Sequence, residues 1–310
     1  MIIIGSGIAG LLASRYFHYL NPVIYEKQCK LPNNHSALLR FKKDEFSKTI
    51  GIPFKKVSVQ KGVLLENETI TTSPSMREMN AYSYKVMGFI HNRSIINMEP
   101  GYRFIAPEDL IHQLSLTANI KFNTNILDIT LLPNVNKIST IPMPKLMKLL
   151  NYDNIPTFES HSICTVDCTV KDIDAYQTLY IPYGSEDPYR MSITGNKLTL
   201  EYSGDCPDDS NHQYFAEADI AYFGNIMFGI KPKYTDLKIK IQPYGKILNI
   251  SENVRKDFMF WASYNHGIYS LGRYACWKPG LLLDDLIDDV RLITAFMASK
   301  NRYDERKEQT

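Results

Sequence analysis

The sequence predicts an α/β protein in which a doubly wound parallel sheet is interrupted by a mainly antiparallel β insertion. Residues 1–26 contain an apolar strand, a glycine-rich turn, a helix and a second strand, which is how a parallel βαβ unit begins. Residues 157–244 alternate strand-like runs with glycine turns, a pattern typical of antiparallel strands. Residues 258–297 return to strand and helix patterns that can complete the first sheet.

The glycine turn is the most specific motif in the chain. The strand Met1–Ile4 is followed directly by Gly5-Ser6-Gly7-Ile8-Ala9-Gly10. In a dinucleotide-binding turn, Gly5 makes the sharp exit from the strand, Gly7 lets the backbone approach a pyrophosphate, and Gly10 lets the helix lie close to the sheet. The free N–H groups and the positive dipole end of the helix that starts near Gly7 then attract an anion.

Glu26 strengthens this interpretation. It lies 21 positions after Gly5, at the end of the second strand, where an acid accepts hydrogen bonds from ribose hydroxyls. An acid there repels a 2′-phosphate, so the pattern favours FAD or NAD(H) over NADP(H). The alternative is a secretory signal peptide, because residues 1–13 are nearly all apolar. The stretch lacks a basic start, however, and Arg15-Tyr16 follows it without a small-residue cleavage site.

The composition is that of an ordinary globular protein, with 44% hydrophobic and 22% charged residues. The net charge of +2 is too small to argue for nucleic acid binding, although DNA stays open as a partner. No later apolar run approaches the ~20 residues that span a bilayer, so we expect a cytoplasmic protein without a membrane partner. Cys164 and Cys168 have no second pair of ligands nearby, so no metal site is predicted.

We expect two domains, each built from separated segments. Residues 1–43, 101–155 and 246–310 are predicted to form the dinucleotide-binding domain. Residues 44–100 and 156–245 are predicted to form the substrate or cap domain. Ligands bind at the carboxyl ends of strands in such a parallel sheet.

Several elements of the first domain can be assigned from the pattern. Residues 120–126, 127–131 and 258–262 are predicted to be strands. Residues 279–297 are predicted to be a long amphipathic helix. A helix that begins at Pro279-Gly280 would point its positive end at the bound dinucleotide.

Four stretches resemble flavoproteins of the amine oxidase and UDP-galactopyranose mutase group. Residues 120–129 resemble the strand that contacts the adenosine of FAD, and Ile138-Ser139-Thr140-Ile141-Pro142 resembles the STIP segment of the group. Residues 180–192 are similar to a strand pair in the substrate domain of the mutase-like members. Leu271-Gly272-Arg273-Tyr274-Ala275, with Trp277 and Asp284-Asp285, resembles the C-terminal flavin motif. The resemblance implies a Rossmann-type, glutathione-reductase-like domain that holds FAD non-covalently.

The motif and the resemblance together give the predicted cofactor-binding residues. In many flavoproteins a Gly-Gly pair follows the acid, where this chain has Asn33-Asn34-His35-Ser36. Either His35 and Arg40 face the cofactor in a variant arrangement, or this stretch is a solvated basic loop. The predicted residues are Gly5, Ser6, Gly7, Ile8, Ala9, Gly10, Glu26, Lys27, Arg40, Ile126, Thr140, Gly272, Arg273, Gly280, Leu281 and Leu282.

Three residues are candidates for catalysis, and the sequence does not choose among them: His35, Arg190 and His266. Arg190 either meets an anionic substrate, as the resemblance implies, or is a solvated strand end. His266 is predicted to lie in a polar loop before the C-terminal flavin motif. Histidine carries protons near neutral pH, but a lone loop histidine is more often simply exposed.

The resemblance implies an FAD-dependent oxidoreductase or lyase that acts on a C–N or C–O bond of a polar small molecule. The reaction is either a net oxidation or a redox-neutral one in which the flavin is a nucleophile or a transient electron sink. Residues 35–41 and 105–109 also resemble flavoprotein-like sequences of bacteriophages, some implicated in thymine hypermodification as lyases on amino-acid-substituted bases. The substrate would then be a modified nucleotide in DNA, with Lys55, Lys56 and Lys61 along its approach.

A non-catalytic protein that binds FAD or NAD is the other alternative, and the missing Gly-Gly pair favours it. The sequence gives neither the substrate nor the catalytic base nor the oligomeric state.

Overall fold

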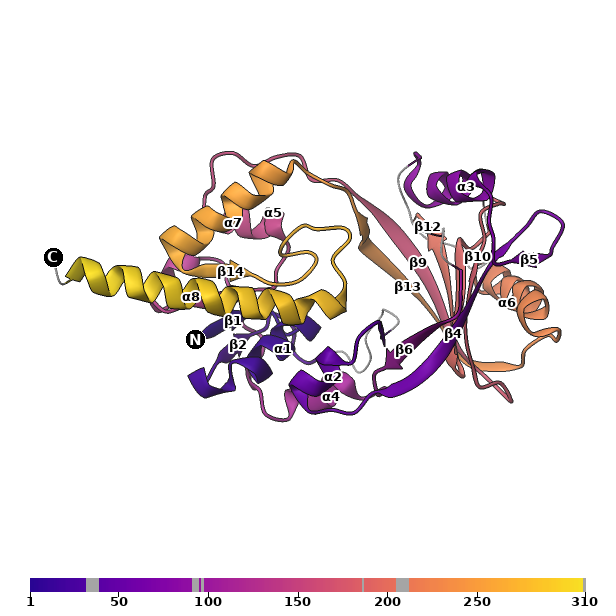
Figure 1. Ribbon diagram of the computed structural model, residues 1–310, viewed down its shortest axis with the longest axis horizontal. Coiled ribbons are helices and arrows are strands. Elements are labelled where there is room, and N and C mark those ends of the chain that lie inside the picture. The colour runs from indigo at the N-terminus through magenta and orange to yellow at the C-terminus, as the bar shows by residue number, and fades with distance from the viewer. Residues whose placement is uncertain (32–38, 91–94, 96–97, 186, 205–211, 309–310) are drawn as a thin grey trace. The chain divides into compact units, whose positions relative to one another are not determined.

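The structure is a computed structural model that describes residues 1–31, 39–90, 95, 98–185, 187–204 and 212–308. The chain forms two compact units (Figure 1). Unit 1 contains residues 1–55, 104–159 and 247–310, and unit 2 contains residues 56–103 and 160–246. The functional roles predicted for the two domains remain predictions.

A five-stranded parallel sheet forms the centre of unit 1, with the strand order β14-β8-β1-β2-β7. Its strands are β1 (Ile2–Ile4), β2 (Val23–Tyr25), β7 (Asn119–Lys121), β8 (Lys137–Ser139) and β14 (Ile268–Ser270). The middle strand β1 is three buried isoleucines, as expected for a parallel strand covered on both faces.

Helices cover both faces of this sheet, as they do in a doubly wound fold (Figure 1). Ile3 contributes to the core on the side of α1, α2, α4 and α8. Its neighbours Ile2 and Ile4 contribute to the core on the side of α5 and α7. The helices and the short strand of unit 1 are α1 (Ile8–Tyr16), η1 (His18–Leu20), β3 (Arg40–Phe41), α2 (Glu45–Ile50), α4 (Leu110–Ser115), η2 (Ile129–Leu131), α5 (Met143–Leu149), α7 (Glu252–His266), η3 (Leu283–Asp285) and α8 (Leu286–Glu308).

The predicted strand at residues 258–262 is wrong, because these residues lie inside helix α7. Phe258 and Ala262 are buried, whereas Phe260 between them is 68% exposed. Burial four residues apart is the helical period, and a strand would have placed all three side chains on one face. His266, predicted in a loop, is therefore the last residue of α7, and the helix ends at Gly267 in the left-handed region.

Two further predictions in unit 1 are corrected. The long C-terminal helix starts at Leu286 and not at Pro279, because the Asp285 carboxylate accepts the Leu282 N–H (2.8 Å) and the 3-10 turn η3 comes first. The positive end of α8 is therefore not at Pro279-Gly280. Of the strands predicted within residues 120–131, only β7 forms, and residues 129–131 are the 3-10 turn η2.

A larger, mainly antiparallel sheet forms the centre of unit 2. Its strand order is β13-β9-β12-β11-β10-β4-β6, with β5 beside β4. The β10–β11, β11–β12, β12–β9 and β4–β5 pairs are antiparallel, and the β10–β4 pair is parallel. The last two residues of β6, which belong to unit 1, pair with β3. The elements are β4 (Lys55–Leu64), β5 (Ile70–Thr71), α3 (Met76–Met87), β6 (Gly101–Ile105), β9 (Ser160–Val170), β10 (Ala175–Tyr180), β11 (Arg190–Gly195), β12 (Lys197–Ser203), α6 (His212–Phe228) and β13 (Tyr234–Ile247).

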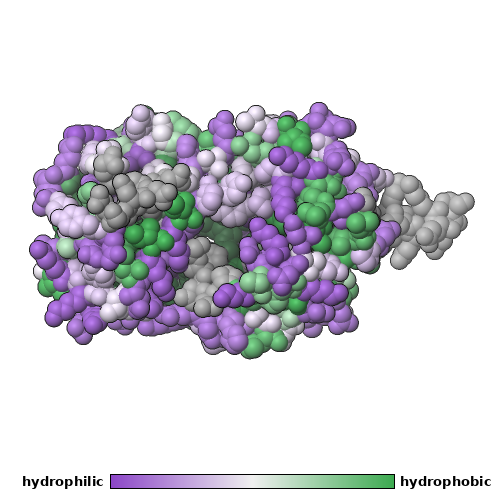
Figure 2. Space-filling model, turned by 180° about the vertical axis from the view of Figure 1, so that it is seen from behind, coloured by the Kyte–Doolittle hydropathy of each residue, from purple (hydrophilic) through white to green (hydrophobic). Residues whose placement is uncertain are grey.

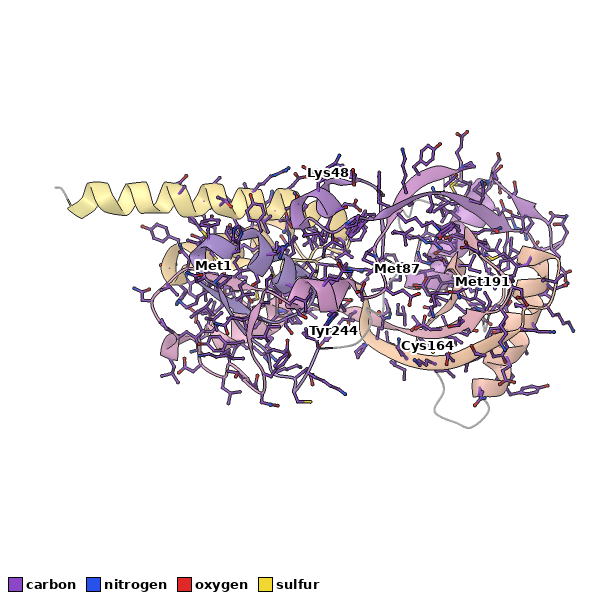
Figure 3. The ribbon with its side chains drawn as sticks, turned by 90° about the horizontal axis from the view of Figure 1, so that it is seen from below. Met1, Lys48, Met87, Cys164, Met191 and Tyr244 are labelled. Carbon is purple, nitrogen blue, oxygen red and sulfur yellow. The ribbon has the colours of Figure 1, made fainter. Side chains whose placement is uncertain are left out.

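One face of this sheet packs against helix α6. Met191, Leu200 and Leu179 are fully buried there with Ile220 and Phe223 of α6. Figure 3 labels Met191 among the densely packed side chains of this unit. The predicted class, a parallel α/β sheet with a separate, mainly antiparallel sheet, is therefore confirmed.

Hydrophilic residues dominate the surface in Figure 2, and the hydrophobic ones form separate small patches. Among the described residues, no helix combines the length and the apolar character that crossing a membrane requires.

Candidate dinucleotide-binding pocket

The glycine turn lies at the carboxyl end of the middle strand of unit 1. Gly5 has a φ of +96°, a conformation that glycine adopts without strain. A Cβ atom on Gly5 would lie 2.4 Å from Oγ1 of Thr140. Thr140 donates hydrogen bonds from its N–H and from Oγ1 to the Ile4 carbonyl, both at 2.9 Å. Thr140, which directly follows β8, thus packs against one side of the turn.

Gly7 and Gly10 differ in what surrounds them. A Cβ atom on Gly10 would lie 2.0 Å from the Gly5 carbonyl oxygen, so only glycine lets α1 approach the turn this closely. A Cβ atom on Gly7 would meet no atom within 4 Å. The space at Gly7 faces the start of α1, where Gly7 is the N-cap and no side chain caps the helix. Gly10 therefore serves packing, and Gly7 leaves room at a helix end that favours negative charge.

Glu26 follows β2 and is held by the glycine turn itself. Its carboxylate accepts the Ser6 N–H (2.9 Å), the Ser6 hydroxyl (2.6 Å) and the Gln28 N–H (2.8 Å). Partial burial alone raises the pKa of Glu26, but the hydrogen bonds from Ser6 and Gln28 outweigh it and leave the pKa below its usual value. Glu26 is therefore ionised at neutral pH and fixed in direction.

These residues border a pocket of about 240 Å³. Seven of the predicted cofactor-binding residues line it, and Tyr25, Asn125 and Lys145 are among the lining residues that the sequence did not single out. Lys145 follows the recognised STIP segment by three residues, which is a signal that could have identified it. The predicted residues in the lining are Gly5, Ser6, Gly7, Glu26, Lys27, Ile126 and Thr140.

The charges around the pocket suit a nucleotide diphosphate. Lys27 and Lys145 line it together with Gly7. Two ammonium groups and a free helix N-terminus attract phosphate oxygens, while the fixed carboxylate of Glu26 accepts hydrogen bonds from hydroxyl groups. The residues present therefore fit the adenosine diphosphate half of FAD or NAD.

The remaining predicted cofactor-binding residues lie outside the pocket lining. Ile8, Ala9 and Gly10 form the first turn of α1, and a Cβ atom on Gly272 would lie 3.2 Å from that of Ala9. The guanidinium carbon of Arg273 is 5.8 Å from the centre of the Tyr274 ring.

Arg40, Gly280, Leu281 and Leu282 do not line the pocket either. Arg40 pairs with Ile105 through the backbone of β3. Leu281 is buried in the core beside α1, and Leu282 is 42% exposed. A Cβ atom on Gly280 would meet no other atom within 4 Å.

The candidate catalytic residues belong to different parts of the chain. His266 precedes β14, whose first residue, Ile268, pairs with the first residue of β8. It thus lies at the amino ends of the strands, whereas the pocket lies at their carboxyl ends, and its ring contacts Trp261 (4.7 Å between centres). His35 lies outside the described residues. Arg190 belongs to unit 2.

The second face of the unit 2 sheet is polar although much of it is buried. Thr178 pairs with Ser192, Ser192 with Thr199 and Thr199 with Asp167, which makes one row across four strands. The hydroxyls of Thr178 and Ser192 are 3.2 Å apart, and Thr199 donates to Asp167 (2.8 Å). Lys240 of β13 adds an ion pair to Asp167 (3.0 Å).

Arg190 and Glu201 form an ion pair in the next row of this polar face. Glu201 also accepts the Tyr189 hydroxyl (3.1 Å), and Lys246 lies 5.0 Å from the centre of the Tyr189 ring. Burial alone raises the pKa of Glu201, but Arg190 and Lys246 outweigh it and lower the pKa. Arg190 is thus a paired, partly buried residue and not the solvated strand end that was one of its two predicted roles.

A wider, open depression of about 660 Å³ lies in unit 2 at the β9–β10 turn, and it contains none of the predicted site residues. Within the described part of the chain, no three His, Cys, Asp or Glu side chains converge as metal ligands.

Neither protein-family models nor curated protein sequences match this chain. Solved structures do match it. Reduced UDP-galactopyranose mutase superposes with a TM-score of 0.68 at 13% sequence identity, covering 96% of this chain and 93% of that chain. A CLA-producing fatty acid isomerase from P. acnes superposes with a TM-score of 0.62 at 12% identity, covering 95% and 98%.

Aklavinone-11 hydroxylase, solved as a ternary complex with FAD and aklavinone, gives a TM-score of 0.52 at 12% identity. That match covers 87% of this chain and 56% of the hydroxylase chain. Identities this low establish the fold alone. The chain therefore has the fold that a mutase, an isomerase and an FAD-containing hydroxylase share.

Proposed function

We propose that this chain is a flavoenzyme that binds FAD, with the adenosine diphosphate half in the pocket of unit 1. The observation that carries the proposal is the contrast between Gly7 and Gly10. Gly10 packs directly against the backbone of Gly5, whereas the space beside Gly7 is open. Gly7 lies at the N-terminus of α1, and the adjacent Ser6 fixes the carboxylate of Glu26. The likeness in fold to a hydroxylase solved with FAD supports FAD over NAD.

Four side chains of the pocket and the start of α1 have a role in this proposal. Glu26 accepts hydrogen bonds from the ribose hydroxyls, and Ser6 holds the carboxylate in the direction that this requires. The backbone N–H groups at the start of α1 bind the pyrophosphate, while Lys27 and Lys145 offset its charge. FAD, when bound, supplies a ring system that accepts a hydride or acts without net redox change.

We further propose that the substrate is a polar small molecule that reacts at a C–N or C–O bond. The buried row of Thr178, Ser192 and Thr199 supports this, because hydroxyl groups and charged residues at such a face favour a partner that forms hydrogen bonds. Whether the enzyme is an oxidoreductase or a lyase depends on the substrate.

The test is to denature the purified protein and identify the released cofactor. Released FAD, and absorption near ~450 nm that bleaches when the protein is reduced, would support the proposal. A colourless protein that binds NAD would overturn it and would support the non-catalytic alternative.

The phage-type reaction on amino-acid-modified thymine in DNA is the alternative within the same class. Its support is the resemblance at residues 35–41 and 105–109 together with the lysines of β4, of which Lys56 stands 4.5 Å from the centre of the Tyr102 ring. The purified protein is mixed with amino-acid-modified DNA, and the DNA is digested and examined by mass spectrometry. Loss of the side-chain fragment would support this reaction, and unchanged DNA with an FAD-loaded protein would exclude it.

A further inference from the structure

The inward face of helix α3 contacts the connection between β10 and β11 at three levels. Glu78 accepts the Tyr183 hydroxyl (3.0 Å). One turn further, the Tyr82 ring meets Tyr180 and Tyr189 edge to face, at 5.4 and 6.2 Å between centres. The next residue on this face is Lys85. Spacings of four and three residues place these side chains on one side of the helix.

The Lys85 ammonium group is surrounded by backbone carbonyls. Its Nζ donates to Ile181 (3.0 Å), Tyr183 (2.7 Å) and Pro188 (3.1 Å). An ammonium group has three donors, and here each of them has a carbonyl partner. Three carbonyls that converge on one point form an electronegative site that requires a cation.

Two carboxylates add negative charge in the surroundings of Lys85. Burial lowers the pKa of Lys85 to about 8, while the charges of Asp187 and Asp219 act in the opposite direction. Asp219 lies on α6 and accepts the Tyr202 hydroxyl (2.8 Å). The lysine is therefore still mostly protonated at pH 7, and the charges of carboxylates from two segments favour that protonated form.

We propose that the β10–β11 connection forms a cation site for an alkylammonium group, which the chain fills with its own Lys85. The site orders the segment that ends in Tyr189 and Arg190, where the Ile181 N–H donates to the Tyr189 carbonyl (2.9 Å) and the Tyr189 N–H to the Glu201 carbonyl (2.8 Å). Lys85 is thus a positioning residue for the Arg190–Glu201 pair. This inference does not rest on the proposed FAD chemistry.

The test uses Lys85→Met, which keeps the length and apolar stem of the side chain, and Lys85→Ala, which leaves room for a small amine. Lys231→Met removes one exposed positive charge of unit 2 and is the matched control. Hydrogen exchange is followed at the Ile181 and Tyr189 amides. We expect exchange there to be at least about tenfold faster in Lys85→Met and unchanged in the control.

Propylammonium chloride, which supplies the missing stem and charge, is then added to Lys85→Ala, with 1-propanol as the uncharged probe. Slower exchange with propylammonium only would support the cation site. Unchanged exchange in Lys85→Met, or equal effects of the amine and the alcohol, would overturn it. If neither variant folds alone, the folded yield of Lys85→Ala after refolding is compared: a higher yield with the amine supports the site, and equal yields overturn it.

Discussion

The pocket of unit 1 and the polar face of unit 2 both present polar groups, but different parts of the chain build them. The pocket consists of strand ends and a helix start, with backbone groups and the short residues Gly5, Ser6 and Gly7 at its centre. The polar face consists of side chains from the middles of strands, such as Ser192 and Glu201. A site made of backbone depends on local conformation, whereas a site made of strand side chains depends on register.

The largest effect that we expect separates packing from binding in unit 1. Gly10→Ala places a Cβ atom 2.0 Å from the Gly5 carbonyl oxygen, so α1 must move and the unit loses about 3 kcal/mol or more of stability. Gly7→Ala meets no atom and should fold normally but retain less cofactor. Thermal unfolding and the flavin content of both variants are measured. Equal behaviour of the two variants would contradict the assignment of Gly7 to binding.

The next effect concerns the charges of unit 2. Glu201→Gln leaves Arg190 without its ionised partner at a site where Glu201 is 6% exposed, and we expect a loss of about 3 kcal/mol in the free energy of unfolding. Arg190→Met combined with Glu201→Gln should recover part of this loss. Hydrogen exchange resolved by peptide locates the effect in β11 and β12, and a loss confined to unit 1 would refute the expectation.

A smaller effect is expected at Glu26. Glu26→Gln keeps the shape of the side chain but loses the charge, so cofactor affinity should fall by about 1 to 3 kcal/mol, or five- to 150-fold, with the fold intact. Ser6→Ala removes the 2.6 Å hydroxyl contact and should give a smaller loss in the same direction. Titration of FAD into the stripped protein measures both, and an affinity unchanged by Glu26→Gln would rule out the ribose contact.

The smallest effect is a pH dependence in unit 2. Burial raises the pKa of Asp219 to about 6, above its value in the unfolded chain. The stability contributed by its protonation is therefore full below about pH 4 and is lost as the pH rises through 6. Because Asp219 is partly exposed, we expect only about 1 kcal/mol. Asp219→Asn should remove this dependence, which urea unfolding at pH 4, 5, 6 and 7 would show.

The contrast between the two regions also explains what the sequence could predict. Gly5, Gly7, Gly10 and Glu26 follow one local pattern, so the turn, the helix α1 and their place in a parallel sheet could be predicted together. Lys145 and Asn125 reach the same pocket from distant segments, and no local spacing connects them to Gly7. In the sequence, only their nearness to Pro142 and to Ile126 points to this pocket.

The wrong element predictions have a similar cause, because side-chain contacts that the sequence pattern does not show decided each of them. The aromatic run around Phe260 suggested a strand by propensity, but burial at Phe258 and Ala262 has the helical period. The start of α8 depends on the Asp285 side chain, which accepts the Leu282 N–H. Pro279 and Gly280 instead suggested an earlier helix start. The row from Thr178 to Asp167 joins residues of four strands, and only the register brings them together.

The division of unit 1 into three segments has a consequence for synthesis of the protein. Unit 2 ends at residue 246, but the parallel sheet of unit 1 still lacks β14, and its two faces still lack α7 and α8. A chain made from its amino end therefore releases all of unit 2 before unit 1 has its last strand. During that interval Ile2 and Ile4 lack the helix that later covers them, and the nascent chain exposes a half-covered sheet that is prone to wrong pairing.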